Sequence, residues 1–339
     1  MTVNARDETA TGRAATMKAI VRDTYGSADV LELGDTDRPE IGDEEVLVRV
    51  YAAGVGRDVW HVMTGLPYPI RLAGYGFRAP NNPVIGSDVA GVVEALGKNV
   101  RRFQPGDEVF GIGKGSYAEY VCAREDKLAP KPGNLTFEQA AVVAIMGSTA
   151  LQALRDHGKV EPGQEVLIIG ASGGVGTYAV QIAKAFGAQV TGVCSTRKVE
   201  MVRSIGADHV IDYTKEDFAK SDQRYDLILD IGGNSTLARL RRALTSRGTL
   251  LITGGEGGGR WLGGTDRQLR AMMLSPFVSQ KLGTFVSTPN HEDLLVLKEL
   301  IESGKVTPVI DRTYPLAEVP EAMRYLEGGH AKGKVLITV

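Results

Sequence analysis

Cysteine and histidine are scarce in this sequence. Among 339 residues there are two cysteines, Cys122 and Cys194, and five histidines scattered along the chain. These numbers exclude a disulfide framework and a cysteine-rich zinc site. Two thiols in unrelated contexts fit a reducing compartment, so we expect a cytoplasmic protein.

Excess charge and long apolar runs are also missing. The formal net charge is -2, which gives no general attraction to nucleic acid or to an anionic membrane. No apolar stretch approaches the length of a membrane span. We therefore expect neither a nucleic-acid partner nor a membrane partner. Residues 1–16 are polar and lack the apolar segment of a signal peptide, so we expect a disordered tail there.

The most informative stretch is glycine-rich. An apolar run over 166–169 enters the turn 170–176, a helical pattern leaves it, and a second apolar run follows over 189–194. Backbone N–H groups and the helix dipole at such a turn hold a pyrophosphate, so the pattern predicts a dinucleotide site. The alternative, a glycine-rich turn that binds nothing, is disfavoured by the strand before it and the helix after it. The predicted contacts in this turn are Ala171, Ser172, Gly173, Gly174, Val175 and Gly176.

The pattern of elements changes twice along the chain. From residue 17 to about 130, many short strands separated by turns predict a β-barrel. From residue 164, strands and helices alternate, which predicts a parallel, doubly wound sheet. The last segment resembles the first region more than the middle. We therefore predict a tail over 1–16, a barrel domain made of 17–140 and 291–339, and a Rossmann domain over 141–290.

Two motifs are similar to those of a known superfamily. One is the turn 170–176 with the helix that follows it, and the other is the segment 97–109, which matches a barrel-domain signature. The sequence resembles the medium-chain dehydrogenase/reductase superfamily, in its zinc-independent, quinone oxidoreductase-like branch. The resemblance implies an α/β fold, a doubly wound parallel Rossmann sheet inserted into a GroES-like β-barrel domain. It also implies a homodimer that forms through an edge strand near 284–287.

The resemblance allows the metal site to be compared residue by residue. Zinc enzymes of the family carry two cysteines and a histidine where this chain has Gly56, Ile145 and Ser87. Glycine and isoleucine offer no ligand, and serine is a poor one for zinc. We therefore expect no catalytic metal.

The end of the second Rossmann strand indicates which cofactor is bound. NAD enzymes place an acid there for the ribose 2′-hydroxyl, but this chain continues with Ser195, Arg197 and Lys198. These side chains could bind a 2′-phosphate, so we predict NADP(H); the alternative is two solvated charges at a helix start. Tyr213 either packs on the adenine or is a surface aromatic. Further cofactor contacts are expected at Thr149, Cys194, Gly254 and Lys332.

The absence of zinc limits the chemistry. Without a Lewis acid, reduction of a simple ketone is difficult, whereas quinones and α,β-unsaturated carbonyls delocalise the arriving negative charge. We predict an NADPH-dependent reductase of such conjugated compounds. Two alternatives are a metal-free alcohol or aldehyde dehydrogenase, and a cofactor-binding protein of low activity with a structural or regulatory role.

The candidate catalytic residues follow Gly56. In the resemblance, Asp58 and His61 stand at proton-relay positions, and either a relay or His61 alone could protonate the product. The alternatives are that His61 only packs under the cofactor and that solvent supplies the proton. Arg57 is placed to hold an anionic group, or forms a surface salt bridge. Predicted substrate contacts are Trp60, Tyr68, Tyr75 and Trp261.

Overall fold

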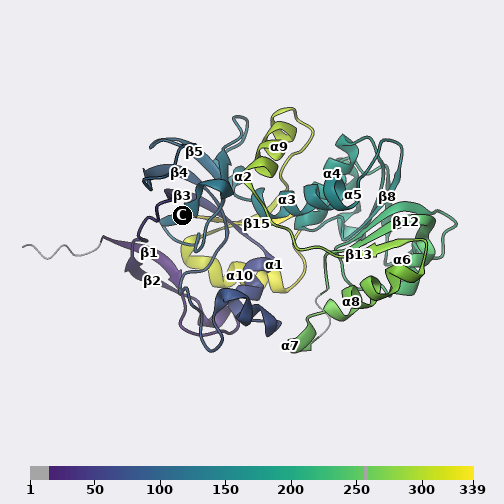
Figure 1. Ribbon diagram of the computed structural model, residues 1–339, viewed down its shortest axis with the longest axis horizontal. Helices are drawn as coiled ribbons and strands as arrows, with labels where there is room; N and C mark the ends of the chain where they lie inside the picture. Colours follow the sequence, from purple (N-terminus) through teal and green to yellow (C-terminus); the bar gives the residue numbers. More distant parts are fainter. Residues whose placement is uncertain (1–14, 256–258) are drawn as a thin grey trace, which may run out of the picture.

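The computed structural model describes residues 15–255 and 259–339, and it has two large sheets that lie in two halves of an elongated molecule (Figure 1). The predicted tail lies outside the described residues except for its last two positions. None of the helices within the described ranges is long and apolar enough to cross a membrane.

The first half is built on a seven-stranded sheet. Its order is β14-β15-β3-β4-β5-β7, and β6 pairs with β3. A two-stranded sheet of β1 and β2 lies beside it. The bounds are β1 Thr16–Val21, β2 Glu32–Asp37, β3 Glu45–Val55, β4 Asp88–Leu96, β5 Glu108–Ile112, β6 Tyr120–Arg124, β7 Leu128–Pro130, β14 Ile310–Pro315 and β15 Lys334–Thr338.

The second half is a six-stranded parallel sheet in the order β10-β9-β8-β11-β12-β13. Numbered within this half, that order is 3-2-1-4-5-6, the doubly wound arrangement of dinucleotide-binding folds. Its central strands are apolar runs buried on both faces, as parallel strands require. The bounds are β8 Glu165–Ile169, β9 Gln189–Cys194, β10 His209–Asp212, β11 Tyr225–Asp230, β12 Leu244–Ile252 and β13 Lys281–Gly283.

Ten α-helices in the described residues connect and cover these sheets. Because β15 pairs antiparallel with β3, the end of the chain completes the first sheet. The bounds are α1 Arg57–Thr64, α2 Phe137–Ala140, α3 Ala144–Gln152, α4 Gly174–Ala185, α5 Val199–Ser204, α6 Leu237–Ala243, α7 Gly259–Leu262, α8 Thr265–Leu274, α9 His291–Glu302 and α10 Val319–Glu327.

Two elements depend on a hydrogen bond from a single hydroxyl group. The segment 136–155 contains two α-helices, α2 and α3, because the chain turns at Val142, whose carbonyl accepts a hydrogen bond from the Tyr178 hydroxyl (3.0 Å). The last Rossmann strand is β13, not 284–287. The Thr284 hydroxyl donates to the Ile252 carbonyl (2.7 Å) and so takes the acceptor that a longer strand would have used.

Candidate cofactor site and active site

The glycine-rich turn lies at the carboxyl end of β8 and leads into α4. Gly170 has a positive φ of 90°, and a Cβ on Gly176 would lie 2.1 Å from the Gly170 carbonyl oxygen. Gly173 caps α4 without a side-chain hydrogen bond. Side chains are excluded at these points, so the first N–H groups of α4 remain open to an anion.

A cavity of about 750 Å³ lies at the carboxyl ends of β8, β9 and β11. This is the crevice in which doubly wound folds bind dinucleotides. The predicted cofactor contacts that line it are Ser172, Cys194, Ser195, Lys198 and Tyr213. The cavity and the open helix end therefore fit a dinucleotide.

Lys198 is the predicted cation that the structure brings to this cavity. Its ammonium donates to the Ala331 carbonyl (2.7 Å), and partial burial lowers the pKa of Lys198. Lys332 is exposed but close enough to influence Lys198. Arg197 is exposed and is not part of the cavity wall. Lys198 is therefore part of the cavity wall, whereas its sequence neighbour Arg197 is in solvent.

An acid, Asp212, lies at the carboxyl end of β10, next to the strand that ends before Ser195. Asp212, which ends β10, accepts hydrogen bonds from the Thr196 hydroxyl (2.6 Å) and from the backbone and hydroxyl of Thr214 (3.1 and 2.8 Å). These bonds, the Thr196 hydroxyl first, lower the pKa of Asp212 to about 2. The carboxylate is thus occupied by the two loops that follow β9 and β10.

The remaining predicted cofactor residues come from three other segments: α3, the loop after β12 and the segment before β15. The Gly333 amide donates to the Ser172 carbonyl (2.9 Å), so the segment before β15 joins the glycine-rich turn. The Thr149 hydroxyl donates to the Ile145 carbonyl (2.7 Å) within α3. A Cβ on Gly254 would lie 1.8 Å from the Ile231 carbonyl oxygen, so only glycine fits there.

An ion pair that the sequence analysis did not identify holds two loops beside the cavity. Arg267 lies 2.8 Å from the Oδ2 atom of fully buried Asp230, and it donates to the carbonyls of Ser235 (2.5 Å) and Gly254 (3.2 Å). Burial raises the pKa of the Asp230 carboxyl, and Arg267 opposes this shift. The only sequence signal was an aspartate at the end of an apolar strand.

Helix α1 carries the predicted catalytic residues. The Nδ1 atom of His61 lies 2.7 Å from the Leu66 carbonyl oxygen, which can only accept, so Nδ1 carries the proton. Both carboxyl oxygens of Asp58 are buried and have no hydrogen-bond partner among the described residues. Positions 58 and 61 are three apart on one helix and therefore share a face.

Arg57 and Trp60, which precede Asp58 and His61 in the sequence, contact the end of α10. Arg57 donates to the Leu326 carbonyl (3.4 Å), and the Trp60 indole donates to Glu327 (2.7 Å). Arg57 thus makes a contact within its own half of the molecule.

Beneath α1 lies a second buried ion pair. The Lys334 ammonium donates to Asp88 Oδ2 (3.0 Å), and the Ile145 amide donates to Asp88 Oδ1 (2.9 Å). Burial raises the pKa of Asp88, Lys334 opposes this shift, and the charge of Asp58 adds to it. Burial, with the Asp58 and Asp88 charges, raises the pKa of Tyr117 well above its usual value. Sequence analysis missed Lys334, although one lysine beside an apolar closing strand is a usable signal.

The residues at the family's zinc position do not fit a metal ion. A Cβ on Gly56 would lie 2.2 Å from Asp58 Oδ1 and 3.2 Å from the Lys334 ammonium. The Lys334 ammonium therefore lies where a zinc ion held by a ligand at position 56 would have to be, and its positive charge would repel the ion. Across the described ranges, no group of three or more His, Cys, Asp and Glu residues is arranged to hold a metal ion.

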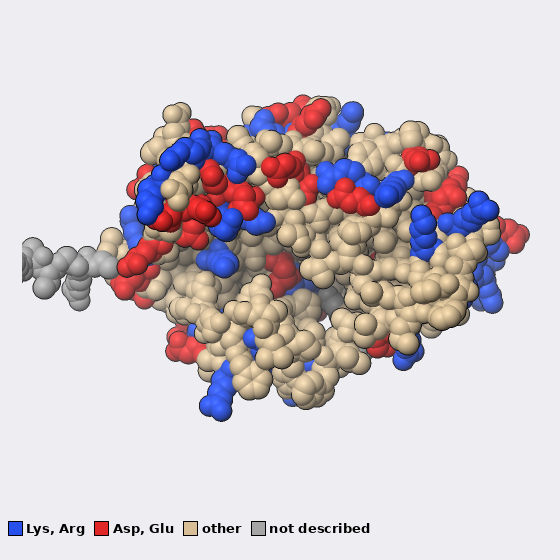
Figure 2. Space-filling view, in the orientation of Figure 1, with Lys and Arg blue, Asp and Glu red and all other residues tan. Residues whose placement is uncertain are grey.

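Two of the predicted substrate aromatics meet between the halves of the molecule. The rings of Tyr68 and Trp261 are in edge contact, with centroids 5.1 Å apart, and the Tyr68 amide donates to the Arg260 carbonyl (2.9 Å). Tyr75 is exposed, and its backbone carbonyl accepts from the Tyr25 hydroxyl (2.7 Å). A hollow separates the two halves in the space-filling view (Figure 2).

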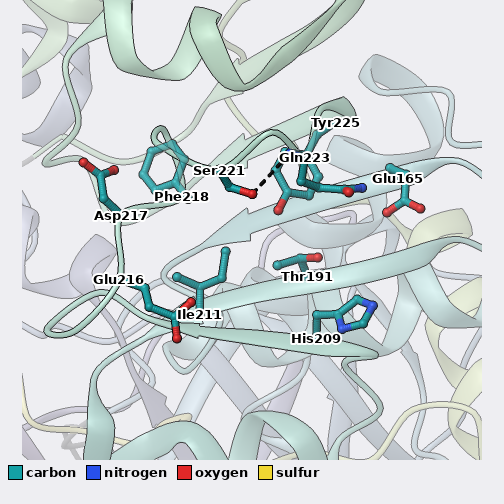
Figure 3. A pocket seen from close by; sticks show the side chains of 10 residues that line it. All are labelled: Glu165, Thr191, His209, Ile211, Glu216, Asp217, Phe218, Ser221, Gln223 and Tyr225. Carbon is teal, nitrogen blue, oxygen red and sulfur yellow. Dashed lines mark hydrogen bonds between the residues drawn. The ribbon is translucent and has the colours of Figure 1, made fainter.

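A second, smaller cavity of about 330 Å³ lies elsewhere on the parallel sheet. It is lined by residues near the amino ends of the strands, among them Glu165, His209 and Tyr225 (Figure 3). Dinucleotides bind at the carboxyl ends, so this cavity is not the cofactor site.

Comparison with known proteins agrees with this architecture. An alcohol dehydrogenase GroES-like domain matches residues 42–133, and a zinc-binding dehydrogenase domain matches residues 205–337. The mitochondrial NAD(P)H oxidoreductase RTN4IP1 of Mus musculus is 35% identical, over 98% of this chain and 91% of that protein.

A plant enzyme and a solved structure are similarly close. The chloroplastic NADPH-dependent alkenal/one oxidoreductase of Arabidopsis thaliana is 35% identical, over 95% of this chain and 79% of that protein. The structure of the quinone oxidoreductase from Coxiella burnetii has a TM-score of 0.82 and 30% identity, over 96% of this chain and 100% of that chain. The chain belongs to the medium-chain dehydrogenase/reductase superfamily of oxidoreductases, in its zinc-independent, quinone oxidoreductase-like branch.

Proposed function

We propose that this protein is an NADPH-dependent, zinc-independent reductase of quinones or α,β-unsaturated carbonyl compounds. The observation that carries the proposal is the cavity at the open end of α4, with Ser195 and Lys198 in its wall and no acid directly after β9. Relatives named as an alkenal/one reductase and a quinone oxidoreductase support the substrate class.

The cofactor would be held mainly by the parallel-sheet half of the molecule. The open N–H groups of α4 would bind the pyrophosphate, and Ser195 and Lys198 would bind the 2′-phosphate. Tyr213, 62% exposed at the rim, would cover the adenine. When bound, the reduced nicotinamide supplies a hydride. The chain itself supplies position and a proton.

The proton source that fits best is His61. Since Nδ1 is held by the Leu66 carbonyl, the Nε2 atom of a protonated ring is the one left to donate. Asp58, on the same face of α1, would orient the His61 ring or return a proton to it after each turnover. Hydride addition at the β-carbon of an enone leaves an enolate, and a proton from Nε2 then completes the saturated ketone.

An assay with three acceptors tests the proposal. NADPH oxidation is measured with an enone, a quinone and a simple aldehyde, with and without a chelator. We expect turnover of the conjugated acceptors that the chelator does not change. Aldehyde turnover that the chelator abolishes contradicts the zinc-free assignment, and tight NADPH binding without turnover of any acceptor favours the cofactor-binding alternative.

We also propose a homodimer formed along β13. Among the described residues, this strand pairs with β12 alone, which leaves its outer edge open. Strongly exposed apolar side chains flank it, Phe277 (82%) and Val286 (91%) among them. Light scattering would give a dimer mass for the native protein and a monomer mass for F277S/V286S. A monomer mass for the native protein contradicts the proposal.

The other partner and compartment predictions stay proposals. We propose no nucleic-acid partner, on the net charge of -2. The cytoplasmic location still rests on the cysteine content alone, and two relatives are named as mitochondrial and chloroplastic proteins. The domain boundaries at 140 and 290 are proposed from the change of strand pattern.

A further inference from the structure

A patch of exposed apolar and cationic side chains lies at the edge of the active site. It comes from two segments: the loop 66–82 that follows α1, and α7. We name it the loop–α7 patch, and its members are Leu72, Phe77, Arg78, Arg260, Trp261 and Leu262.

The two segments form one surface. The Tyr68–Trp261 ring contact and the hydrogen bond from the Tyr68 amide to the Arg260 carbonyl join them. A Cβ on Gly263 would lie 2.8 Å from the Pro67 ring, so the backbone at Gly263 packs directly on that ring. Both segments lie along the lower edge of the molecule (Figure 1).

Backbone carbonyls of the loop are held by hydrogen bonds, while two of its apolar side chains point into solvent. The Tyr25 hydroxyl contacts the carbonyls of Tyr75 and Gly76 (2.7 Å each), and Arg71 donates to the Gly65 carbonyl (3.0 Å). Leu72 and Phe77 nevertheless remain 75% and 69% exposed. Two large apolar side chains so strongly exposed and close in sequence are unusual for a loop that is only solvated.

The charge of the patch has one sign. No Asp or Glu occurs between Asp58 and Asp88, although 24% of the chain is charged. Within the described ranges, the guanidinium groups of Arg78 and Arg260 have no hydrogen-bond or ion-pair partner, and both residues are exposed. Glu256, which precedes α7, lies outside the described residues.

The space-filling view agrees with this composition. Uncharged side chains dominate the lower edge, with a few cationic and acidic side chains toward its two ends (Figure 2). Protruding aromatic and aliphatic tips with unpaired arginines are what the interface of an anionic bilayer accommodates. The exposed apolar side chains beside β13 have already been assigned to a second copy, so they are not part of this patch.

We propose that the loop–α7 patch docks this protein on an anionic lipid surface, from which the adjacent site takes a membrane-dissolved quinone or enone. The membrane docking is inferred from the patch alone. That the site takes its substrate from the membrane rests on the proposed function. The net charge of -2 led us to expect no membrane partner, because a chain-wide sum does not show that acids are missing from one edge.

Vesicle co-sedimentation tests the docking without using activity. The full-length protein is mixed with vesicles of phosphatidylcholine, with and without phosphatidylglycerol. We expect binding to the anionic vesicles and little to the neutral ones. L72S/F77S should reduce binding at least tenfold, since two apolar side chains no longer insert. R78Q/R260Q should reduce it by about fivefold for each arginine.

Matched variants elsewhere on the surface are the controls. L33S/L295S removes two exposed leucines, and R102Q/R242Q removes two exposed arginines, all outside the patch. Both should bind like the native protein. Absence of native binding, or equal losses in patch and control variants, overturns the proposal. If the native protein does not bind vesicles and L72S/F77S has a lower oligomeric mass, the patch is instead an interface between two copies of this chain.

Activity distinguishes the two proposals. L72S/F77S should keep its rate with a water-soluble enone and lose most of its rate with a long-chain quinone held in anionic vesicles. If the native protein reduces no enone in solution, the proposed function fails, while the vesicle result still decides the docking.

Discussion

The ammonium of Lys334 lies 3.0 Å from Asp88 Oδ2, and the two side chains are only 2% and 1% exposed. The pair joins the first residue of β15 to the first residue of β4, beneath the helix that carries Asp58 and His61. In the family's zinc enzymes a metal lies nearby, whereas here an internal cation and its counter-ion occupy the region.

Removing either partner of this pair should be strongly destabilising. K334M or D88N alone leaves an uncompensated or poorly solvated group in the interior, so we expect a loss of about 3–5 kcal/mol in the free energy of unfolding. The double variant should lose less than the sum of the two. Urea unfolding of all four proteins gives the coupling, and strictly additive losses would show that the charges do not interact.

Substituting His61 tests the proton donor. H61Q should lower kcat with an enone by about 100-fold and leave the KM for NADPH almost unchanged. The control is W60F, because the Trp60 ring packs at 5.0 Å from the His61 ring but carries no transferable proton. An unchanged kcat for H61Q would mean that solvent supplies the proton.

The two neighbouring cations should contribute unequally to cofactor choice. K198A should raise the KM for NADPH about tenfold or more, since a charge-assisted hydrogen bond to the 2′-phosphate is lost, and should leave the KM for NADH unchanged. R197A should have a smaller effect, because Arg197 is not in the cavity wall. Steady-state kinetics with both cofactors make the comparison, and an equal rise for NADH would argue against a phosphate role.

Arg267 should act as a positioning residue for the cofactor loops. R267A frees the loops at Ser235 and Gly254 and leaves Asp230 unpaired, so we expect a higher KM for NADPH and a lower melting temperature. Added guanidinium at millimolar concentration should bring the KM of R267A for NADPH part of the way back to the native value. A melting-temperature loss with unchanged KM would limit Arg267 to a structural role.

Asp212 should make stability depend on pH on the acid side. Its pKa is about 2 in the folded protein and about 3.9 in an unfolded chain, so its stabilising contribution is present above about pH 4 and disappears as pH falls toward 2. The melting-temperature difference between the native protein and D212N should therefore shrink from pH 6 to pH 3. A difference that does not change with pH would contradict the assignment.

The fold was predictable because its signals are local. Strand 166–169, the glycine turn and the helix after it are contiguous in sequence, and their periodicity changes where the sheet type changes. The break at Val142 and the short β13 were not predictable, since each depends on a single hydroxyl, of Tyr178 or Thr284, that binds a carbonyl.

The site was predictable only in part, for a similar reason. Ser195, Lys198 and Tyr213 follow recognisable strands, and the structure brings them to one cavity. The pairs Lys334–Asp88 and Arg267–Asp230 join residues 246 and 37 positions apart, and no local pattern links them. The exposed loop–α7 patch likewise exists only once the loop meets α7.

Hydride transfer from labelled cofactor tests the central claim most directly. The metal-stripped protein is given an enone and NADPH that carries deuterium at nicotinamide C4, and the product is analysed for the position of the label. We expect a saturated ketone with deuterium at the β-carbon, formed faster from NADPH than from NADH. Deuterium on the carbonyl carbon, or loss of turnover after metal removal, would contradict the account.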